Sequence, residues 1–261
     1  PSSNHFLLSA TKLNLAATAG NFITVGAYMS DRFSNVNGLV GTAVSFTAEA
    51  GAIQPLTLAD AYGIAYADYT AGAGFPANGK LTVMASTQGE EAFVDNNGNG
   101  LYDIGESFAD ISEPFLDINE NGVRDADELF IDVNGNGAYD GPNGLWDGPN
   151  CPAAGCVKPA TIWTSMALTL STNANCAAGI SPGPTFTTIP DGLFQSFTFT
   201  VQDLNGNSMI GGTTVTVTKN ASEGTLSGQL SATISDTATG PATLNFVLSD
   251  SSPGNSSAIQ S

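Results

Sequence analysis

Short runs of alternating apolar and polar residues, separated by Gly, Asn and Pro, predict an all-β protein. Between residues 6 and 90 these runs are rich in β-branched and aromatic residues, as in "NFITVGAYMS", "TAVSFTAEA" and "KLTVMAST". A period of two is typical of strands with one buried face, and the Gly and Pro positions between runs indicate turns. The runs begin about ten to twenty residues apart, which favours a β-sandwich.

The alternation is interrupted over residues 88–158 and then resumes. The interruption is rich in Asp, Asn and Gly, with only isolated apolar residues, and strand character returns at "ATIWTSMALTLS", Ala160–Ser171. We interpret Ala160–Ser171 as the last strand of a first sandwich, residues 1–174, and the interruption as an insertion between two of its strands. The runs "FTFTVQD", "TTVTVTKN" and "PATLNFVLSD" then predict a second sandwich, residues 175–261, which stops before its last strand.

Acidic residues are concentrated in the insertion. The net charge is −18, and fifteen of the 24 acidic residues lie between Glu90 and Asp147, with Arg124 as the only base in that stretch. So many carboxylates repel one another unless cations neutralise them, which favours a divalent-cation site over a merely soluble surface. The charge excludes a nucleic-acid binder, and no apolar run is long enough to insert into a membrane.

Two consecutive twelve-residue stretches match the calcium loop of EF-hands. That loop takes oxygen ligands from positions one, three, five, seven, nine and twelve, uses the backbone carbonyl at position seven, and needs Gly at position six for a sharp turn. The ligand positions are Asp95, Asn97, Asn99, Leu101, Asp103 and Glu106 in the first stretch, and Asp117, Asn119, Asn121, Val123, Asp125 and Glu128 in the second. Two complete matches in succession predict two Ca²⁺ sites.

A third copy of the loop is incomplete. Asn143 stands at its twelfth position, and we expect a third ion to bind more weakly there or with a borrowed carboxylate such as Asp147. Asp110 and Glu113 either complete a neighbouring site or are solvated. "DLNGNSM", from Asp203, begins like another loop but lacks the final Glu, and we interpret it as a turn. The ligand positions of the third copy are Asp132, Asn134, Asn136, Ala138 and Asp140.

The sequences beside the loops are too short for the helices that flank EF-hand loops. We therefore expect the ions to replace a hydrophobic core, with a thin apolar seam between the loops formed by Phe93, Phe108, Phe115, Leu129 and Phe130. Extracellular modules of this kind bind calcium at about 0.1–1 mM. Trp163 is expected in a strand facing the core, and Trp146 as a loop anchor or an exposed contact.

The cysteines and the single histidine argue against a catalytic or zinc site. Cys151 and Cys156 bracket "CPAAGC", which predicts a small disulfide loop; two unpaired thiols are the alternative, and Cys176 is left over. A zinc site needs four ligands, and His5 is far away in sequence. The many Ser and Thr residues have no His to activate them, and the acidic pairs are already placed as calcium ligands, so we expect no enzyme activity.

The first unit resembles bacterial immunoglobulin-like domains of the invasin and intimin type. The phrases that carry the resemblance are "LSATKLNLAATAGNFITVGAYMSDRF", "GIAYADYTAG" and "GKLTVMASTQGEE", and "FTFTVQDLNGNSMIGGTTVTVT" repeats the strand–turn–strand phrase in the second unit. The resemblance implies tandem immunoglobulin-like sandwiches in a cell-surface or extracellular stalk, adhesin or filament, and it supplies no catalytic residues. The acidic insertion is not part of the family's basic pattern.

The sequence thus favours a calcium-stabilised structural module, with a calcium-dependent carbohydrate- or receptor-binding adhesin as the alternative. Expected partners are neighbouring immunoglobulin-like domains, other copies of the chain, or a surface glycan. A second sandwich without its last strand exposes an edge that another strand could fill, and "NHFLLSATKLNLA", residues 4–16, is a candidate donor for polymerisation.

Overall fold

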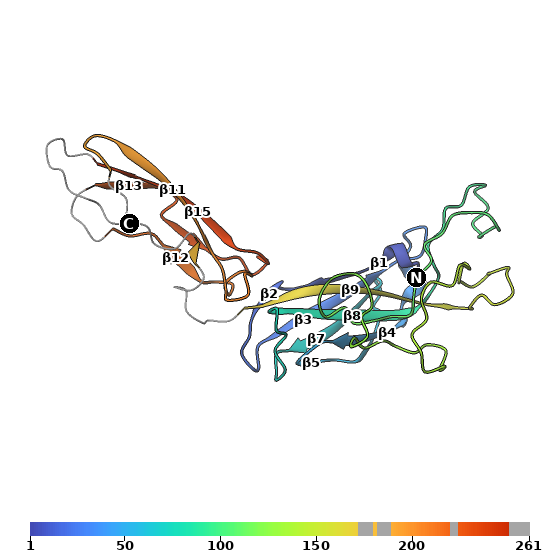
Figure 1. Ribbon diagram of the computed structural model, residues 1–261. Helices are drawn as coiled ribbons and strands as arrows, with labels where there is room; N and C mark the ends of the chain where they lie inside the picture. Colours follow the sequence, from blue (N-terminus) through green and yellow to red (C-terminus); the bar gives the residue numbers. More distant parts are fainter. Residues whose placement is uncertain (172–179, 182–188, 220–223, 251–261) are drawn as a thin grey trace. The chain divides into compact units, whose positions relative to one another are not determined.

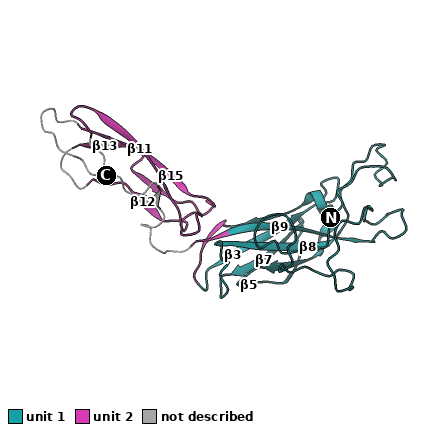
Figure 2. Cartoon of the chain, in the orientation of Figure 1, with its two compact units in different colours: residues 1–11, 19–168 teal, residues 12–18, 169–261 magenta. Residues whose placement is uncertain are grey.

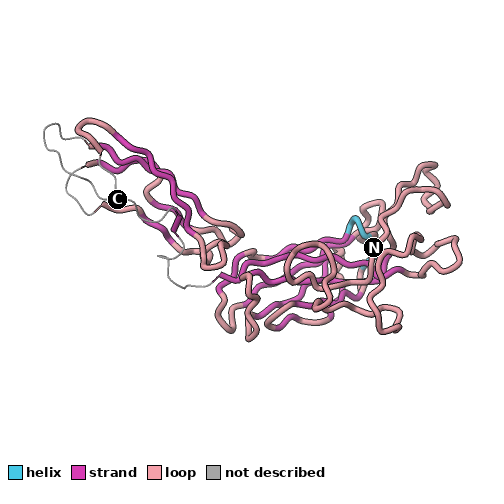
Figure 3. Tube along the Cα trace, in the orientation of Figure 1, coloured by secondary structure: helices cyan, strands magenta, loops and turns pink. Residues whose placement is uncertain are grey.

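The computed structural model describes residues 1–171, 180–181, 189–219 and 224–250 as strands joined by loops (Figures 1 and 3). The only helical turns in these residues are two 3₁₀ turns, η1 (Ser3–His5) and η2 (Asn37–Leu39). The all-β prediction is confirmed. No helix in the described part of the chain has the length and apolar character needed to cross a membrane.

The strands follow the alternating runs of the sequence. Ala160–Ser171, predicted as one strand, is strand β9 with the same bounds. The strands before it are β1 (Phe6–Ala10), β2 (Asn14–Ala16), β3 (Phe22–Met29), β4 (Ala43–Ala48), β5 (Ala52–Ile53), β6 (Leu56–Leu58), β7 (Ile64–Thr70) and β8 (Lys80–Gly89). Those after it are β10 (Ile180–Ser181), β11 (Phe194–Val201), β12 (Thr214–Thr216), β13 (Thr225–Gly228), β14 (Ser231–Thr233) and β15 (Ala242–Ser249).

The chain forms two compact units, coloured separately in Figure 2. Unit 1 comprises residues 1–11 and 19–168, and unit 2 comprises residues 12–18 and 169–261. This division differs from the predicted boundary after residue 174, because residues 12–18 and the end of β9 form backbone hydrogen bonds with one another and with the rest of unit 2. The N–H groups of Leu13 and Asn14 donate to the carbonyl of Asp236, and that of Thr169 donates to the carbonyl of Leu13.

Unit 1 is sandwich-like. One sheet has the strand order β1-β3-β7-β5, and the other contains β9-β8-β4-β6. Alternate residues of β3 and β7 face inward in register, so that Val25 lies opposite Ala67 and Ile23 opposite Tyr69, all of them buried. Burial of this apolar face supplies most of the free energy of folding, at roughly 25 cal/mol per Å² of apolar surface.

Strand β8 is buried on both faces, unlike the half-exposed strands around it. Leu81, Val83 and Ala85 face the core, while Thr82 and Met84 point the other way and are also buried. The hydroxyl of Thr82 donates to the carbonyl of Asp117, 2.8 Å away in the insertion. The insertion therefore covers part of the outer face of this sheet, and the sheet holds one side of the insertion in place.

Unit 2 is a smaller β-structure. It contains a four-stranded sheet, β10-β11-β15-β13, and a two-stranded sheet, β12-β14. Its buried core consists of Val201, Met209, Ile234 and Leu244. The predicted turn at Asp203 is confirmed, since its Oδ1 accepts hydrogen bonds from the N–H groups of Asn205 and Asn207. Two predictions fall on residues outside the described part of the chain. They are the pairing of Cys176, and the missing last strand, which depends on residues 251–261.

The predicted donor segment is already paired within its own chain. Phe6–Ala10 forms the antiparallel edge strand β1 beside β3, and Asn14–Ala16 forms β2, parallel to the end of β9. Residues 4–16 therefore do not form a free strand. Their donation to another copy would require these pairings to open.

Candidate calcium-loop insertion

The acidic insertion joins the end of β8 at Gly89 to the start of β9 at Ala160 (Figure 1). It contains no helix and no regular strand, and Figure 3 shows it as loops. Two isolated antiparallel bridges close it, one between Phe93 and Phe108 and one between Phe115 and Phe130. Each bridge encloses one of the two complete twelve-residue loops.

The first loop is folded around the carboxylate of Asp95, at position one. Its Oδ1 accepts hydrogen bonds from the N–H groups of Gly98 and Asn99, and its Oδ2 accepts one from Gly100 at 2.7 Å. Gly100 has φ 76°, in the left-handed region that glycine adopts without strain. These backbone hydrogen bonds, that of Gly100 first, hold the pKa of Asp95 below its ordinary value, despite an opposing effect of desolvation.

The far side of the first loop is closed by Glu106, at position twelve. Its Oε1 accepts the N–H of Asn96 at 2.7 Å, and its Oε2 accepts the N–H of Asp103 at 3.0 Å. The side-chain amides of Asn97 and Asn99 both donate to Oδ2 of Asp103. The loop thus turns the side chains predicted as ligands toward one another, although Glu106 is eleven residues from Asp95 in the sequence.

The second loop repeats this arrangement. Glu128 accepts the N–H groups of Ile118 and Asp125, both at 2.9 Å, and Asp117 accepts those of Asn121 and Gly122. The amides of Asn119 and Asn121 donate to Asp125, and these two hydrogen bonds lower the pKa of that carboxyl. Gly122 has φ 76°, the same value as Gly100.

The third loop has the same first part and a different closing residue. Asp132 accepts the N–H groups of Gly135, Asn136 and Gly137, and Asn134 and Asn136 donate to Asp140. The carboxylate that closes this loop is Glu113, which precedes it in the chain. Glu113 is therefore not merely solvated. Asp147, suggested from the sequence as the borrowed carboxylate, does not close the third loop.

A fourth set of side chains shows the same hydrogen bonds without forming a continuous loop. Asp110 accepts the N–H groups of Asn143 and Gly144, Asn143 donates to Asp147, and Glu91 accepts the N–H groups of Ile111 and Asp147. Sequence reasoning missed this set because its members come from three separate segments. A signal was present, since "NGLWD", residues 143–147, matches "NGLYD", "NGVRD" and "NGAYD" in the three loops.

Glu91 is the most deeply buried carboxylate of the insertion, with 1% of its surface exposed. Burial raises its pKa to about 7; the negative charges of Asp147 and Asp110 act in the same direction, and the two backbone hydrogen bonds oppose it. Asp147 is 8% exposed. Burying carboxylates without a counter-charge is costly, and hydrogen bonds from backbone N–H groups offset only part of that cost.

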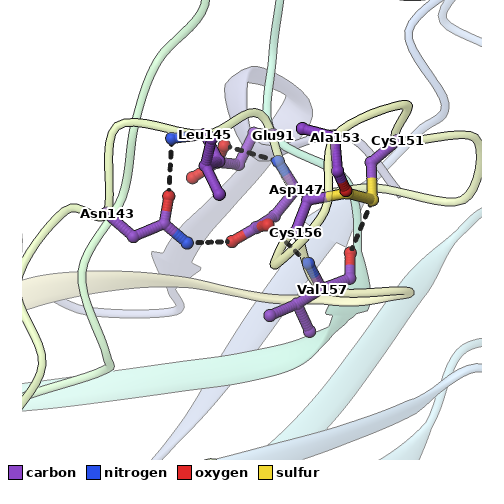
Figure 4. The surroundings of a disulfide bond; sticks show 8 residues. All are labelled: Glu91, Asn143, Leu145, Asp147, Cys151, Ala153, Cys156 and Val157. Carbon is purple, nitrogen blue, oxygen red and sulfur yellow. Dashed lines mark hydrogen bonds between the residues drawn. A yellow bond between two sulfur atoms is a disulfide. The ribbon is translucent and has the colours of Figure 1, made fainter.

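A disulfide holds the far end of this fourth set (Figure 4). Cys151 and Cys156 are bonded, which confirms the predicted disulfide loop. The adjacent Val157 donates its N–H to Oδ1 of Asp147 at 2.6 Å, while Oδ2 of Asp147 accepts the amide of Asn143. The covalent loop thereby fixes the backbone that orients Asp147.

Aromatic side chains pack between the loops in two clusters rather than in one seam. Phe93, Phe108, Tyr102 and Trp146 form the first, with Tyr102 stacked on Trp146 at 4.9 Å between ring centroids. Phe115, Phe130, Tyr139 and Trp163 form the second. The prediction for Leu129 is wrong, because its side chain is 68% exposed.

The two tryptophans anchor the insertion. Trp146 is buried and donates its Nε1–H to the carbonyl of Glu91 at 2.8 Å, which makes it the loop anchor of the two alternatives. Trp163 does not lie in the sandwich core as predicted. It is only partly buried, stacks edge-on against Phe115, and donates to the carbonyl of Ser112.

One arginine connects the insertion to the sandwich, and a second packs within the insertion. Arg32, from the loop after β3, forms a bidentate ion pair with Glu90 and donates to the carbonyl of Gly100 in the first loop. Its guanidinium also lies over the ring of Phe93, 4.8 Å from the centroid. Arg124, the single base between Glu90 and Asp147, lies over the rings of Phe130 and Tyr139 and donates to the carbonyl of Glu128.

The donor groups of the loops fit a hard cation. They are carboxylate, amide and carbonyl oxygens, the ligands that Ca²⁺ takes in flexible loops. Within the described residues, no group of three or more His, Cys, Asp or Glu side chains is placed so that it could hold a metal ion by these groups alone. A cation in these loops would therefore depend on the Asn amides and the position-seven carbonyls as well.

Comparison with known proteins gives little further information. No family model and no curated protein matches this chain. Among solved structures, the chain is similar to the Yersinia pseudotuberculosis adhesin InvE, with 14% sequence identity and a TM-score of 0.30. The match covers 95% of this chain and 52% of that one, so the chain spans about half the length of the InvE structure.

Proposed function

We propose that this chain is a non-enzymatic, calcium-stabilised structural module of a bacterial cell-surface or extracellular protein, built from immunoglobulin-like sandwiches of the invasin and intimin type. The observation that carries the proposal is the repetition of one arrangement in two consecutive loops. Glu106 and Glu128 each close a twelve-residue loop through the N–H groups of positions two and nine. The sequence pattern and the backbone conformation therefore agree in both copies.

Charge supports a cation in these loops. Fifteen carboxylates and one base lie between residues 90 and 147. In the described chain, the ion pairs that involve this stretch are Arg32–Glu90 and Lys80–Glu120. Divalent ions in the first two loops, held by the predicted ligands, would remove repulsion among the remaining carboxylates and stabilise a segment that buries few apolar side chains.

The disulfide supports an extracellular location. Disulfides persist in oxidising compartments and are rare in the reducing cytosol. Extracellular calcium modules bind their ion at about 0.1–1 mM, a range in which they are saturated outside cells. Both features favour a protein that works at the cell surface, where a stalk or filament gains rigidity from bound ions.

Calcium titration of the full chain, by equilibrium dialysis, tests this proposal. Asp125→Asn removes a carboxylate predicted as a ligand of the second loop and should eliminate one bound ion. Asp127→Asn is the matched control, because Asp127 is an exposed acid of the same loop outside the predicted ligand set. Failure to bind calcium at millimolar concentration, or equal losses in the two variants, would overturn the proposal.

A specific hollow favours the adhesin alternative as a second candidate. Beside the second loop, Phe115, Tyr139 and Trp163 line a surface depression together with Arg124 and Asp117. Aromatic rings next to polar groups suit stacking against a sugar ring. A glycan array probed with and without calcium tests this candidate: calcium-dependent binding that Trp163→Ala abolishes is expected, and an array without signal in either condition contradicts it.

A further inference from the structure

The third loop lacks the carboxylate that its sequence pattern requires. Asp132, Asn134, Asn136 and Asp140 occupy the same relative positions as their counterparts in the complete loops, but position twelve is Asn143. The side chain of Asn143 is engaged elsewhere, donating to Asp147 and accepting the N–H of Leu145. A third calcium site therefore needs its bidentate ligand from another part of the chain.

Glu113 occupies that place. Its Oε1 accepts the N–H of Val133 at 2.8 Å, and its Oε2 accepts the N–H of Asp140 at 3.1 Å. Val133 and Asp140 are positions two and nine of the third loop. These are the two positions whose N–H groups bind Glu106 in the first loop and Glu128 in the second. Glu113 thus makes the contacts of a twelfth-position glutamate although it lies nineteen residues before position one.

The backbone around the second loop places Glu113 there. The N–H of Glu113 donates to the carbonyl of Asp140 at 3.0 Å, and Ile131 donates to the carbonyl of Pro114 at 2.8 Å. The bridge between Phe115 and Phe130 continues this pairing toward the second loop. The segment that closes the base of the second loop therefore also presents the Glu113 side chain to the third.

No described basic residue neutralises Glu113 by an ion pair. Its carboxylate instead faces the loop that carries Asp132 and Asp140. These carboxylates do not form a metal site by themselves. A divalent cation would also need the side-chain oxygens of Asn134 and Asn136 and the carbonyl of Ala138, and its charge would offset the repulsion among the acidic groups.

We propose that Glu113 is the bidentate ligand of a third calcium ion, out of sequence order, and so links the third loop to the base of the second. This inference rests on the proposed calcium binding and adds a ligand that the loop pattern does not contain. The third ion ties residue 113 to residues 132–140 and encloses the whole second loop. Loss of that ion loosens both loops, whereas loss of the first ion affects only the first loop.

Equilibrium dialysis of the full chain tests the assignment. Glu113→Gln keeps the shape of the side chain but removes its charge, and it should weaken the binding of one ion at least about tenfold while the others remain. Asp127→Asn, the exposed control, should retain every ion. The double variant Glu113→Gln/Asp132→Asn should lose one ion and not two, because both residues hold the same one.

Hydrogen exchange of Asp132→Asn gives a reciprocal readout that does not require the Glu113 variant to fold. In calcium, the amides of residues 113–116 should exchange faster in this variant than in the wild type, while those of residues 95–106 stay protected. Unchanged exchange at 113–116, or full third-ion affinity in Glu113→Gln, would overturn the assignment. A wild-type chain that binds no calcium would instead refute the proposed function itself.

Discussion

The sandwich of unit 1 and the insertion between β8 and β9 are stabilised in opposite ways. Val25, Ala67 and Leu81 have no exposed surface and pack as an ordinary apolar core. In the insertion, Glu91, Glu106 and Glu128 are among the buried residues, and backbone N–H groups surround their carboxylates. The sandwich loses stability when apolar volume is removed, whereas the insertion should lose it when its cations are removed.

A cavity in the sandwich should have the largest effect on global stability. Ile23 on β3 is 2% exposed and lies far along the chain from the insertion, so Ile23→Ala should lower the free energy of unfolding by about 2–5 kcal/mol. Its calcium affinity should equal that of the wild type. Denaturant unfolding and a calcium titration check both statements, and a calcium affinity that falls with the cavity would erase the distinction between the two regions.

Removing the link between the regions should have an intermediate effect. Arg32→Met leaves Glu90, which is 7% exposed, without its counter-charge, and should cost about 2 kcal/mol. The same change at Lys12, whose ion pair with Asp236 is 48% exposed on both sides, should cost less than about 1 kcal/mol. Urea unfolding of the two variants gives the comparison, and equal losses would show that Arg32 does not act as a link.

The smallest predicted effect is the loss of stability at high pH through Tyr69, a buried residue of the sandwich. Burial raises the pKa of Tyr69 to about 12, above its ordinary value of 10. The folded state therefore disfavours the phenolate, and stability is intact below pH 10 and declines as the pH rises toward 12. At pH 11 this should amount to roughly 1 kcal/mol. Tyr69→Phe should remove this part of the pH dependence in thermal melts between pH 9 and 11, and an identical slope in the variant would contradict the assignment.

The strands and the first two loops could be predicted because their signals are local. Alternating apolar residues mark β3, β7 and β9, and the complete twelve-residue pattern marks the loops that begin at Asp95 and Asp117. In each case the residues that act together lie within one turn or one strand. Short-range order in the sequence is then sufficient to place them.

Glu91 and Glu113 could not be assigned from local patterns. Each accepts an N–H from a residue 20 positions later, and each donates its own N–H to a more distant Asp carbonyl, that of Asp147 or Asp140. The underlying regularity is a repeat in which "EAFVDNNGNG" from Glu91 aligns with "EPFLDINENG" from Glu113. Each repeat begins four residues before its calcium loop, so aligning the whole repeats, and not the loops alone, reveals both carboxylates.

Hydrogen exchange of the whole chain, in calcium and in excess EGTA, tests the central difference between the two regions most directly. Amides of residues 91–147 should lose protection when calcium is removed, while those of β3 and β7 should exchange at the same rate in both conditions. Equal protection of residues 91–147 with and without calcium would show that the insertion does not depend on a bound cation for its stability.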